Sequence, residues 1–232
     1  MHSVAADAFQ NSRLLAPWAD GAEFRLTRCW RTSQIEFFDF CQSLLTMPLD
    51  AAVQLCRNRF PPTRGRAHHL QGQMHLVLSH RRRVKINKLC QEAAVKKYRA
   101  ENPEGRVALV EPPAQEEGST KVAQTFELFA GTRLVGASNE TKGIVNGVFM
   151  TVGAVREDDC DVVDEFGNSS TLTFAAIARS TRLAWAITID SSQSREFECP
   201  VVLWDLGSRF YTLRRLYVAI TRVKRPDRLV VV

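Results

Sequence analysis

The hydrophobic pattern near the end of the chain predicts a helix over residues 212–223, followed closely by an apolar strand. The apolar positions of this helix recur at offsets of three, four and seven, which is the spacing of one buried face. They are Leu213, Leu216, Tyr217 and Ile220. At about 100° per residue, Arg215 and Arg222 fall on the opposite side. We therefore expect both arginines to face outward or into a cleft.

Two further helices are predicted near the start of the chain. Ser33 and Glu36 have the S-x-x-E spacing of a capping box and precede an apolar stripe that ends at Pro48. The expected buried face consists of Ile35, Phe38, Cys41, Leu44 and Leu45. A second and shorter helix covers about residues 50–60 and is closed by two prolines.

Apolar runs typical of buried strands occur at residues 74–80, 183–190 and 201–204. The first run is followed by a helical pattern with a period of 3.6 residues. Its expected buried positions are Ile86, Leu89, Cys90, Ala93 and Ala94. Strands that alternate with helices predict a layered α/β domain.

A different pattern separates the first apolar run from the other two. Residues 101–125 are rich in Pro, Glu and Gly, which predicts a linker or a long surface loop. Over residues 126–182 the period changes to two, with short segments such as "GVFMTVGAV" and "CDVVDEF" divided by turn sequences. This predicts a small antiparallel barrel or meander. Because the α/β pattern resumes at residue 183, we expect the β-rich part to be an insertion.

Composition and charge narrow the classes of protein. The 232 residues are 45% apolar and can bury a substantial core. A net charge of +6 and a pI near 9.2 permit a polyanionic partner without requiring one. No apolar run approaches the ~20 residues of a membrane helix, and the first residues lack the layout of a signal peptide. We therefore expect an intracellular protein with no membrane partner, in the cytoplasm or the nucleus.

The six cysteines are scattered along the chain. They form no CxxC pair, and no histidine lies beside them at the spacing of zinc ligands. We expect reduced, mostly buried thiols and no metal site.

Two segments carry a resemblance to a known family. The segment "AITIDSSQSREF" at residues 186–197 resembles motif V of superfamily 1 helicases, and "LYVAITRVKRPDRLVVV" at residues 216–232 resembles motif VI, in both cases especially the RecD-like branch. Upstream, "FRLTRCWRTS" at residues 24–33 resembles motif IV, and residues 131–155 are similar to the SH3-like insertion of that branch. The resemblance covers most of the chain from Phe24 onward and corresponds to the second half of a helicase motor.

The resemblance implies the fold and the division into domains. The expected fold is α/β, namely the second RecA-like domain of a P-loop helicase with a small SH3-like β-barrel insertion. The expected boundaries are an N-terminal extension at 1–23, the RecA-like domain at 24–100 and 183–232, a linker at 101–125 and the insertion at 126–182.

The resemblance also implies roles for particular residues. In the family, the arginines that match Arg31 and Arg222 reach a nucleotide seated mainly on the first RecA-like domain, where a planar guanidinium fits phosphate oxygens. The residue that matches Gln193 senses nucleotide and nucleic acid together. The resemblance and the short polar side chains around it imply nucleic-acid contacts by Ser79, His80, Arg81, Ser191, Ser192 and Thr221.

Each of these residues also has a simpler structural explanation. An arginine opposite an apolar helix face is usually a solvated charge, and serines in "DSSQ" are common helix N-caps. The arginine run at residues 81–83 begins a helix, where the helix dipole disfavours cations. Either the run is a solvated charge cluster, or a negative group meets it.

The chain departs from the family pattern in several places. Asp190 and Ser191 stand where motif V has His and Lys, and Ser194 stands at its glycine. Losing the lysine removes a charge where phosphates would lie, which weakens the expected coupling to nucleic acid. The Gly-rich phosphate cradle G-x-x-x-x-G-K-[ST] does not occur in the sequence. Asp164 and Glu165 lie between turn signals, so we expect a hairpin there and no magnesium site.

We expect the carboxy-terminal motor domain of an ATP-dependent DNA helicase, of the kind used in DNA replication or repair. It would use ATP and Mg²⁺ only together with a complementary N-terminal helicase half, on the same chain or on another one, and would be inactive alone. The alternatives are a non-enzymatic nucleic-acid-binding module and a decayed helicase remnant. A neighbouring reading frame with the phosphate cradle and a strand ending in Asp-Glu would favour the motor domain.

Overall fold

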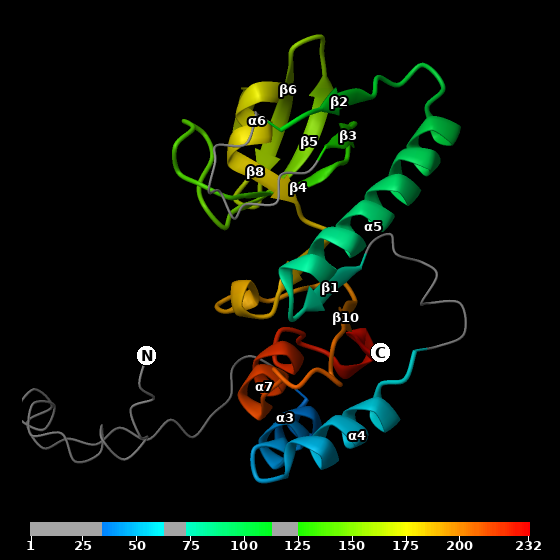
Figure 1. Cartoon of the computed structure of the whole chain (residues 1–232), viewed down its shortest axis with the longest axis vertical. Coiled ribbons are helices and arrows are strands. Elements are labelled where there is room, and N and C mark those ends of the chain that lie inside the picture. The colour runs from blue at the N-terminus through cyan, green and yellow to red at the C-terminus, as the bar shows by residue number, and fades with distance from the viewer. Residues whose placement is uncertain (1–33, 63–72, 113–124) are drawn as a thin grey trace, which may run out of the picture. The chain divides into compact units, whose positions relative to one another are not determined.

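The computed structural model describes residues 34–62, 73–112 and 125–232, which form a mixed α/β fold (Figure 1). The helices are α3 (Ile35–Leu44), α4 (Leu49–Arg59), α5 (His80–Glu101), α6 (Phe174–Ser180), α7 (Leu213–Ile220) and the short 3-10 helices η2 (Asp190–Ser192) and η3 (Pro226–Arg228). The strands are β1 (Met74–Val77), β2 (Ala108–Val110), β3 (Phe126–Leu128), β4 (Arg133–Gly136), β5 (Phe149–Val155), β6 (Asp159–Asp164), β7 (Ser169–Thr173), β8 (Thr181–Leu183), β9 (Ala186–Thr188), β10 (Val201–Leu203) and β11 (Leu229–Val231). Within these ranges, no helix is both long and apolar enough to cross a membrane.

A parallel sheet of four strands forms the centre of the α/β part, in the order β11-β10-β1-β9. All of its strand pairs are parallel. Every residue of these strands is buried, as expected for a parallel sheet covered on both faces. The apolar runs of the sequence therefore correspond to strands of one sheet, and the predicted α/β class is confirmed.

The two faces of this sheet pack against different helices. Leu76, Ile187 and Leu203 belong to an apolar cluster with α3, α4 and α7. Val77 and Ala186 point to the other face and belong to a cluster with α5 and the antiparallel strands. Because successive strand residues alternate between faces, β1 and β9 each contribute to both clusters, whereas β10 and β11 contribute to the first.

Helix α5 covers the free edge of strand β9. The side chain of Asn87 is fully buried, donates to the carbonyl of Ala186 at 3.0 Å and accepts from its amide at 2.8 Å. One turn further along, Gln91 accepts from the indole of Trp185 at 2.6 Å. The amide side chain of Asn87 thus replaces a neighbouring strand and satisfies backbone groups that burial would otherwise leave unpaired.

An antiparallel sheet of five strands lies in sequence between α5 and β9, in the order β7-β6-β5-β4-β8. Helix α6 connects β7 to β8, and its N-cap Thr173 accepts from the amide of Ala176 at 3.2 Å. The β-rich pattern is therefore confirmed as antiparallel strands. Closure of this sheet into an SH3-like barrel and the expected domain boundaries stay predictions. Part of the expected linker is ordered as β2, which pairs with β3.

The face of α3 differs from the one expected. The buried residues are Phe37, Phe40, Cys41 and Leu44, whereas Ile35 and Leu45 are 74% and 44% exposed. Phe37 and Phe40 pack edge to face on Phe60, at ring separations of 6.2 and 5.5 Å, so the large aromatic rings occupy the core. The helix begins after Gln34 without a side-chain cap, so the structure does not use a capping box at Glu36. Ser33 lies outside the described residues.

The cysteines in the described part of the chain are free thiols. Cys41, Cys56, Cys90 and Cys160 are buried and Cys199 is partly buried. Burial raises the pKa of Cys90 to about 12, which keeps this thiol protonated and unreactive at neutral pH. The expectation of reduced, mostly buried thiols is confirmed for these five residues.

Candidate functional site

The segments that follow β1, β9 and β10 meet at one edge of the parallel sheet. The amide of Ile189 donates to the carbonyl of Val77 at 2.9 Å. The amide of Leu78 donates to the carboxylate of Asp205, beyond β10, at 3.1 Å. The carboxyl edge of a parallel sheet is where ligands bind in open α/β folds, so this edge is the candidate site.

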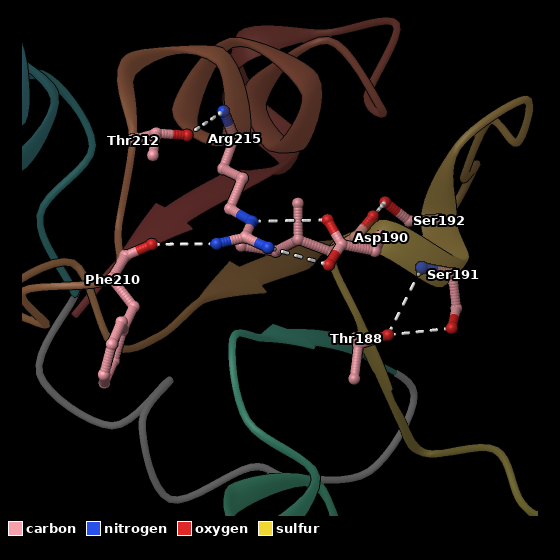
Figure 2. A network of polar contacts seen from close by, with 8 residues as sticks. Thr188, Asp190, Ser191, Ser192, Phe210, Thr212 and Arg215 are labelled. Atoms are coloured by element: carbon pink, nitrogen blue, oxygen red, sulfur yellow. Dashed lines mark hydrogen bonds and ion pairs between the residues drawn. The ribbon is translucent and has the colours of Figure 1, made fainter. Parts of the chain in front are cut away.

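An ion pair links the segment after β9 to helix α7 (Figure 2). Arg215 places its Nε 3.3 Å and its Nη2 3.1 Å from the two carboxylate oxygens of Asp190. Its Nη1 donates to the carbonyl of Phe210 at 2.9 Å. Arg215 therefore faces away from the core, as expected from the periodicity, but it is held by Asp190, which the sequence did not indicate as its partner.

The two serines of this segment differ in exposure and in their hydrogen-bond partners, and the partners are shown in Figure 2. Ser191 is exposed, and its hydroxyl shares a hydrogen bond of 2.8 Å with Thr188. Ser192 is fully buried and donates to the carbonyl of Ile189 at 2.7 Å. A phosphate contact is therefore open to Ser191, whereas the expected contact by Ser192 would require this segment to change conformation. Gln193 is exposed, and its side chain makes no hydrogen bond to a described residue.

Ser194 adopts a backbone conformation that favours glycine. Its φ is +64°, in the left-handed region, and it stands at the position of the motif V glycine. A non-glycine residue there is strained by contact of its Cβ with the backbone. This chain therefore forms a left-handed turn with a serine, at a cost in strain.

Arg195 connects the same segment to the antiparallel sheet. Its Nη1 lies 3.0 Å from both carboxylate oxygens of Glu165, and its Nη2 donates to the carbonyl of Gly147. The guanidinium carbon lies 4.3 Å from the ring centroid of Phe149, a cation–π distance. The sequence does not indicate this role, because the motif pattern leaves position 195 variable.

Arg222 is buried, with 6% of its surface exposed, so of the two expected placements, outward or into a cleft, the outward one is wrong. Helix α7 ends at Ile220, so Arg222 follows the helix and does not obey its periodicity. Its Nε donates to the carbonyl of Val218 at 2.9 Å. Its Nη1 donates to the carbonyls of Ser192 and Arg195 at 3.4 and 3.1 Å. The structure therefore brings the segments that resemble motifs V and VI into direct contact.

Thr221 caps the C-terminal end of α7. Its hydroxyl lies 2.9 Å from the carbonyl of Tyr217 and 3.1 Å from that of Val218, and it accepts from Nη2 of Arg222 at 3.2 Å. These contacts tie Thr221 to the helix end and to Arg222, so its expected nucleic-acid contact has no support from the structure beyond its partial exposure.

The arginine run at the start of α5 meets a negative group at one position. Arg82 places its Nε 2.9 Å from the carboxylate of Asp205. The N-cap Ser79 accepts from the amide of Arg82 at 3.2 Å, so its oxygen is engaged in the cap. His80 and Arg81 are exposed. Partial burial, followed by nearby arginines, lowers the pKa of His80 and favours a neutral imidazole.

Asp164 and Glu165 belong to a hairpin, as expected. The carboxylate of Asp164 accepts from the amides of Phe166 and Asn168 across the turn between β6 and β7. Gly167 takes the left-handed conformation of that turn, with φ of +87°. Among the described residues, no group of three or more His, Cys, Asp or Glu side chains is arranged to hold a metal ion.

The other nucleotide-binding candidate of the sequence, Arg31, lies outside the described residues. Of the remaining candidates, Ser79, His80, Arg81, Ser191 and Gln193 are exposed. Asp205 was not predicted at all, because it is 123 residues from its partner Arg82 and no short motif links them.

Comparison with known proteins identifies the fold. No protein-family model matches the chain, and no curated protein matches it. The Pif1 helicase from Candida albicans has a TM-score of 0.60 and 16% identity, with 88% of this chain and 55% of that chain covered. Pif1 from Bacteroides, in complex with ADP-AlF3 and ssDNA, has a TM-score of 0.57 and 17% identity, with 96% and 58% covered.

A third Pif1 structure, which describes unwinding at forked dsDNA by two coordinating helicases, has a TM-score of 0.56 and 20% identity. The matched region covers 88% of this chain and 48% of that one. The chain therefore shares the α/β fold of Pif1 helicases and spans about half the length of each of these structures.

Proposed function

We propose that this chain is the second motor domain of a superfamily 1 DNA helicase and works with a nucleotide-binding first domain. One observation carries the proposal: the segments that resemble motifs V and VI lie against each other, because Arg222 binds the carbonyls of Ser192 and Arg195. The shared fold with Pif1 helicases supports it. In this proposal, the five-stranded antiparallel sheet is the SH3-like insertion of the RecD-like branch.

The nucleic acid in this proposal is a DNA strand that crosses the carboxyl edge of the parallel sheet. His80 and Arg81 at the start of α5 and Ser191 and Gln193 after β9 are the exposed polar side chains available there. Arg81 supplies charge to a phosphate, and the neutral hydrogen-bonding groups position the backbone without reading base sequence. Binding is therefore expected to be weak, dependent on salt and nearly independent of base sequence.

ATP and Mg²⁺ belong to this proposal only through the first domain. The sequence has no Gly-rich phosphate cradle, and Asp164, the closest approach to a magnesium carboxylate, is engaged in its own turn. The chain alone is therefore expected to hydrolyse no ATP. Arg31 and Arg222 would supply positive charge to the nucleotide across the interface between the two domains.

The arginine-finger role of Arg222 requires a change of conformation. Its nitrogen atoms now donate to backbone carbonyls and to Thr221, and a phosphate would have to replace some of these acceptors. A phosphate is an anion and offers the guanidinium an ion pair and bidentate contacts that neutral carbonyl oxygens lack, so a nucleotide can drive the exchange. Docking of a first domain is the step that would bring the phosphate to Arg222.

The test has two steps. First, binding of a fluorescent single-stranded oligonucleotide is measured by anisotropy at several salt concentrations. We expect the affinity to fall steeply with salt, and an affinity independent of salt would contradict the proposal. Second, the chain is fused to the first domain of a Pif1 helicase, and DNA-stimulated ATP hydrolysis is measured for the fusion, for its Arg222→Ala variant and for an Arg214→Ala control. A loss of turnover specific to Arg222→Ala supports the motor function.

A non-enzymatic nucleic-acid-binding module is the second candidate. It is favoured by the burial of Arg222 and by the ion pair that occupies Asp190 at the motif V histidine position. This candidate predicts salt-dependent DNA binding together with equal, negligible ATP hydrolysis in the fusion and in both of its variants. A decayed remnant would show neither property.

A further inference from the structure

Two arginines, one on helix α5 and one on strand β8, have no side-chain partner in the described part of the chain. Arg83 is 8% exposed, and Arg182 is partly buried. The Nε atom of each guanidinium is fully enclosed and makes no hydrogen bond. No described carboxylate forms an ion pair with either residue. Because buried charges are normally paired, two unpaired arginines indicate that a group is missing between them.

The fold places these two arginines in the same region. Arg83 lies in the first turn of α5, after the N-cap Ser79, and Arg182 is the middle residue of the edge strand β8. The chain leaving β8 packs on α5 through the pairs of Gln91 with Trp185 and Asn87 with Ala186. Burial, followed by the charge of Arg182, lowers the pKa of Arg83 to about 10. The two cations are thus close enough to repel each other.

The neighbouring carboxylates are engaged elsewhere. Asp205 accepts from Arg82 and from the amide of Leu78. Asp190, whose charge acts on His80 nearby, is held in the pair with Arg215. Neither is available to neutralise Arg83 and Arg182. An anion from outside the described residues is therefore needed to offset the repulsion and the loss of solvation.

We propose that Arg83 and Arg182 together bind one phosphate group. Two planar guanidinium groups can donate several parallel hydrogen bonds to phosphate oxygens. The N-terminal end of the 22-residue helix α5 adds a favourable dipole for an anion. Since only Nε of each guanidinium is fully enclosed, the terminal nitrogens are the atoms that an incoming anion reaches.

The phosphate has two candidate sources, a nucleic-acid backbone and free phosphate in solution. The exposed His80 and Arg81 on the same turn of α5 would lead a strand toward the site. The backbone as the source rests on the proposed function, whereas the phosphate site itself does not. The two sources are separated by testing each ligand on the same variants.

The experiment uses the whole chain and titrates inorganic phosphate and, separately, a single-stranded oligo(dT), by calorimetry at constant ionic strength. The variants are Arg83→Met and Arg182→Met, and Lys85→Met is the matched control, because it removes an exposed charge from the same helix. We expect phosphate affinity to fall about tenfold or more in both arginine variants, as for loss of a charge-assisted contact. The Lys85→Met variant should match the wild type.

The outcomes distinguish the two proposals. Loss of phosphate and oligo(dT) affinity in both arginine variants supports a backbone phosphate as the ligand. If the arginine variants lose affinity for phosphate but not for oligo(dT), the ligand is free phosphate. If the wild type binds phosphate but not oligo(dT), the site is supported and the proposed function is contradicted. Phosphate binding that is absent, or equal in all four proteins, overturns the site.

A second measurement guards against variants that do not fold. Arg182 in the wild type is partly exposed and can be modified by phenylglyoxal, and the extent of modification is read by peptide mass spectrometry. We expect phosphate to protect Arg182 and to leave the exposed Arg214 unprotected. Equal modification of Arg182 with and without phosphate overturns the site.

Discussion

The Nη1 atom of Arg222 lies 3.1 Å from the backbone carbonyl oxygen of Arg195, and this hydrogen bond joins segments 27 residues apart. The same guanidinium also binds the carbonyls of Ser192 and Val218. A buried arginine that satisfies three carbonyls stabilises the fold in addition to any role toward a nucleotide. If Arg222 holds the fold together, its loss should lower the stability of the protein. If it served only to contact a nucleotide, its loss should leave the stability unchanged.

Replacement of Arg222 by alanine should lower the free energy of unfolding by about 2–3 kcal/mol, because carbonyls inside the protein lose their donor. The measurement is urea denaturation followed by circular dichroism. Arg214→Ala on the exposed face of α7 is the control and should change stability by less than about 0.5 kcal/mol. Equal stability of the two variants would mean that the contacts of Arg222 contribute little.

Replacement of Ser194 by glycine should stabilise the protein by about 1 kcal/mol, because glycine adopts φ of +64° without strain. The gain is reduced by the greater freedom of glycine in the unfolded chain. Ser191→Gly, in η2, is the matched control and should destabilise, because its backbone φ is not positive. The denaturation midpoints of the two variants should therefore shift in opposite directions, and a shift of both to lower urea would rule out relief of strain.

Much of the α/β architecture could be predicted from hydrophobic runs. Residues 74–80, 183–190 and 201–204 each contain a strand of the parallel sheet, because burial on both faces requires an unbroken apolar run. Helix faces were less predictable. Ile35 is exposed although it fits the helical period, because Phe37 and Phe40 compete for the same core and pack on Phe60.

The residues of the candidate site could be predicted where a short sequence motif indicates them. Their orientation and their long-range partners could not be predicted. Ser191 and Gln193 are exposed, as contact with a ligand requires, but Arg222 follows the end of α7, and a helical wheel extended past Ile220 does not give its direction. Ion pairs such as Arg82 with Asp205 join residues 123 positions apart, and hydrophobic periodicity contains no information about them.

Asp161 on strand β6 should titrate well below other carboxylates. Its hydrogen bonds with Arg156, and then with Thr171, lower the pKa of Asp161 to about 2. A lowered pKa in the folded protein means that the pair stabilises above the ordinary pKa of about 4 and loses this effect as pH falls toward 2. Carboxyl NMR should give a pKa near 2, and Arg156→Met should raise it.

The acid sensitivity of the Arg156→Met variant, compared with that of the wild type, gives a second test of this ion pair. Arg156→Met should also reduce the loss of stability between about pH 4 and pH 2, because the variant no longer has the ion pair to lose. An unchanged pKa of Asp161 in that variant would show that Arg156 is not the main cause.

Introducing a lysine by Ser191→Lys, as the resemblance to motif V suggests, should strengthen binding of single-stranded DNA several-fold at low salt. Ser191 is exposed at the carboxyl edge of the sheet, so a lysine there can reach a backbone phosphate without entering the core. Each phosphate contact adds ~0.7 to the slope of log affinity against log salt for a single strand. Anisotropy titrations at several salt concentrations give both quantities. Ser169→Lys is the matched control, because it adds the same charge at an exposed position of β7.

If net charge alone governs binding, both lysine variants should gain affinity equally, and the edge of the parallel sheet is then not the DNA site. If the strand crosses that edge, only Ser191→Lys should steepen the salt slope. Asp190 lies next to the new lysine, but its carboxylate is already paired with Arg215. It therefore competes only weakly with a DNA phosphate for the ammonium group of the lysine. The difference in slope between the two variants therefore measures contact with the strand.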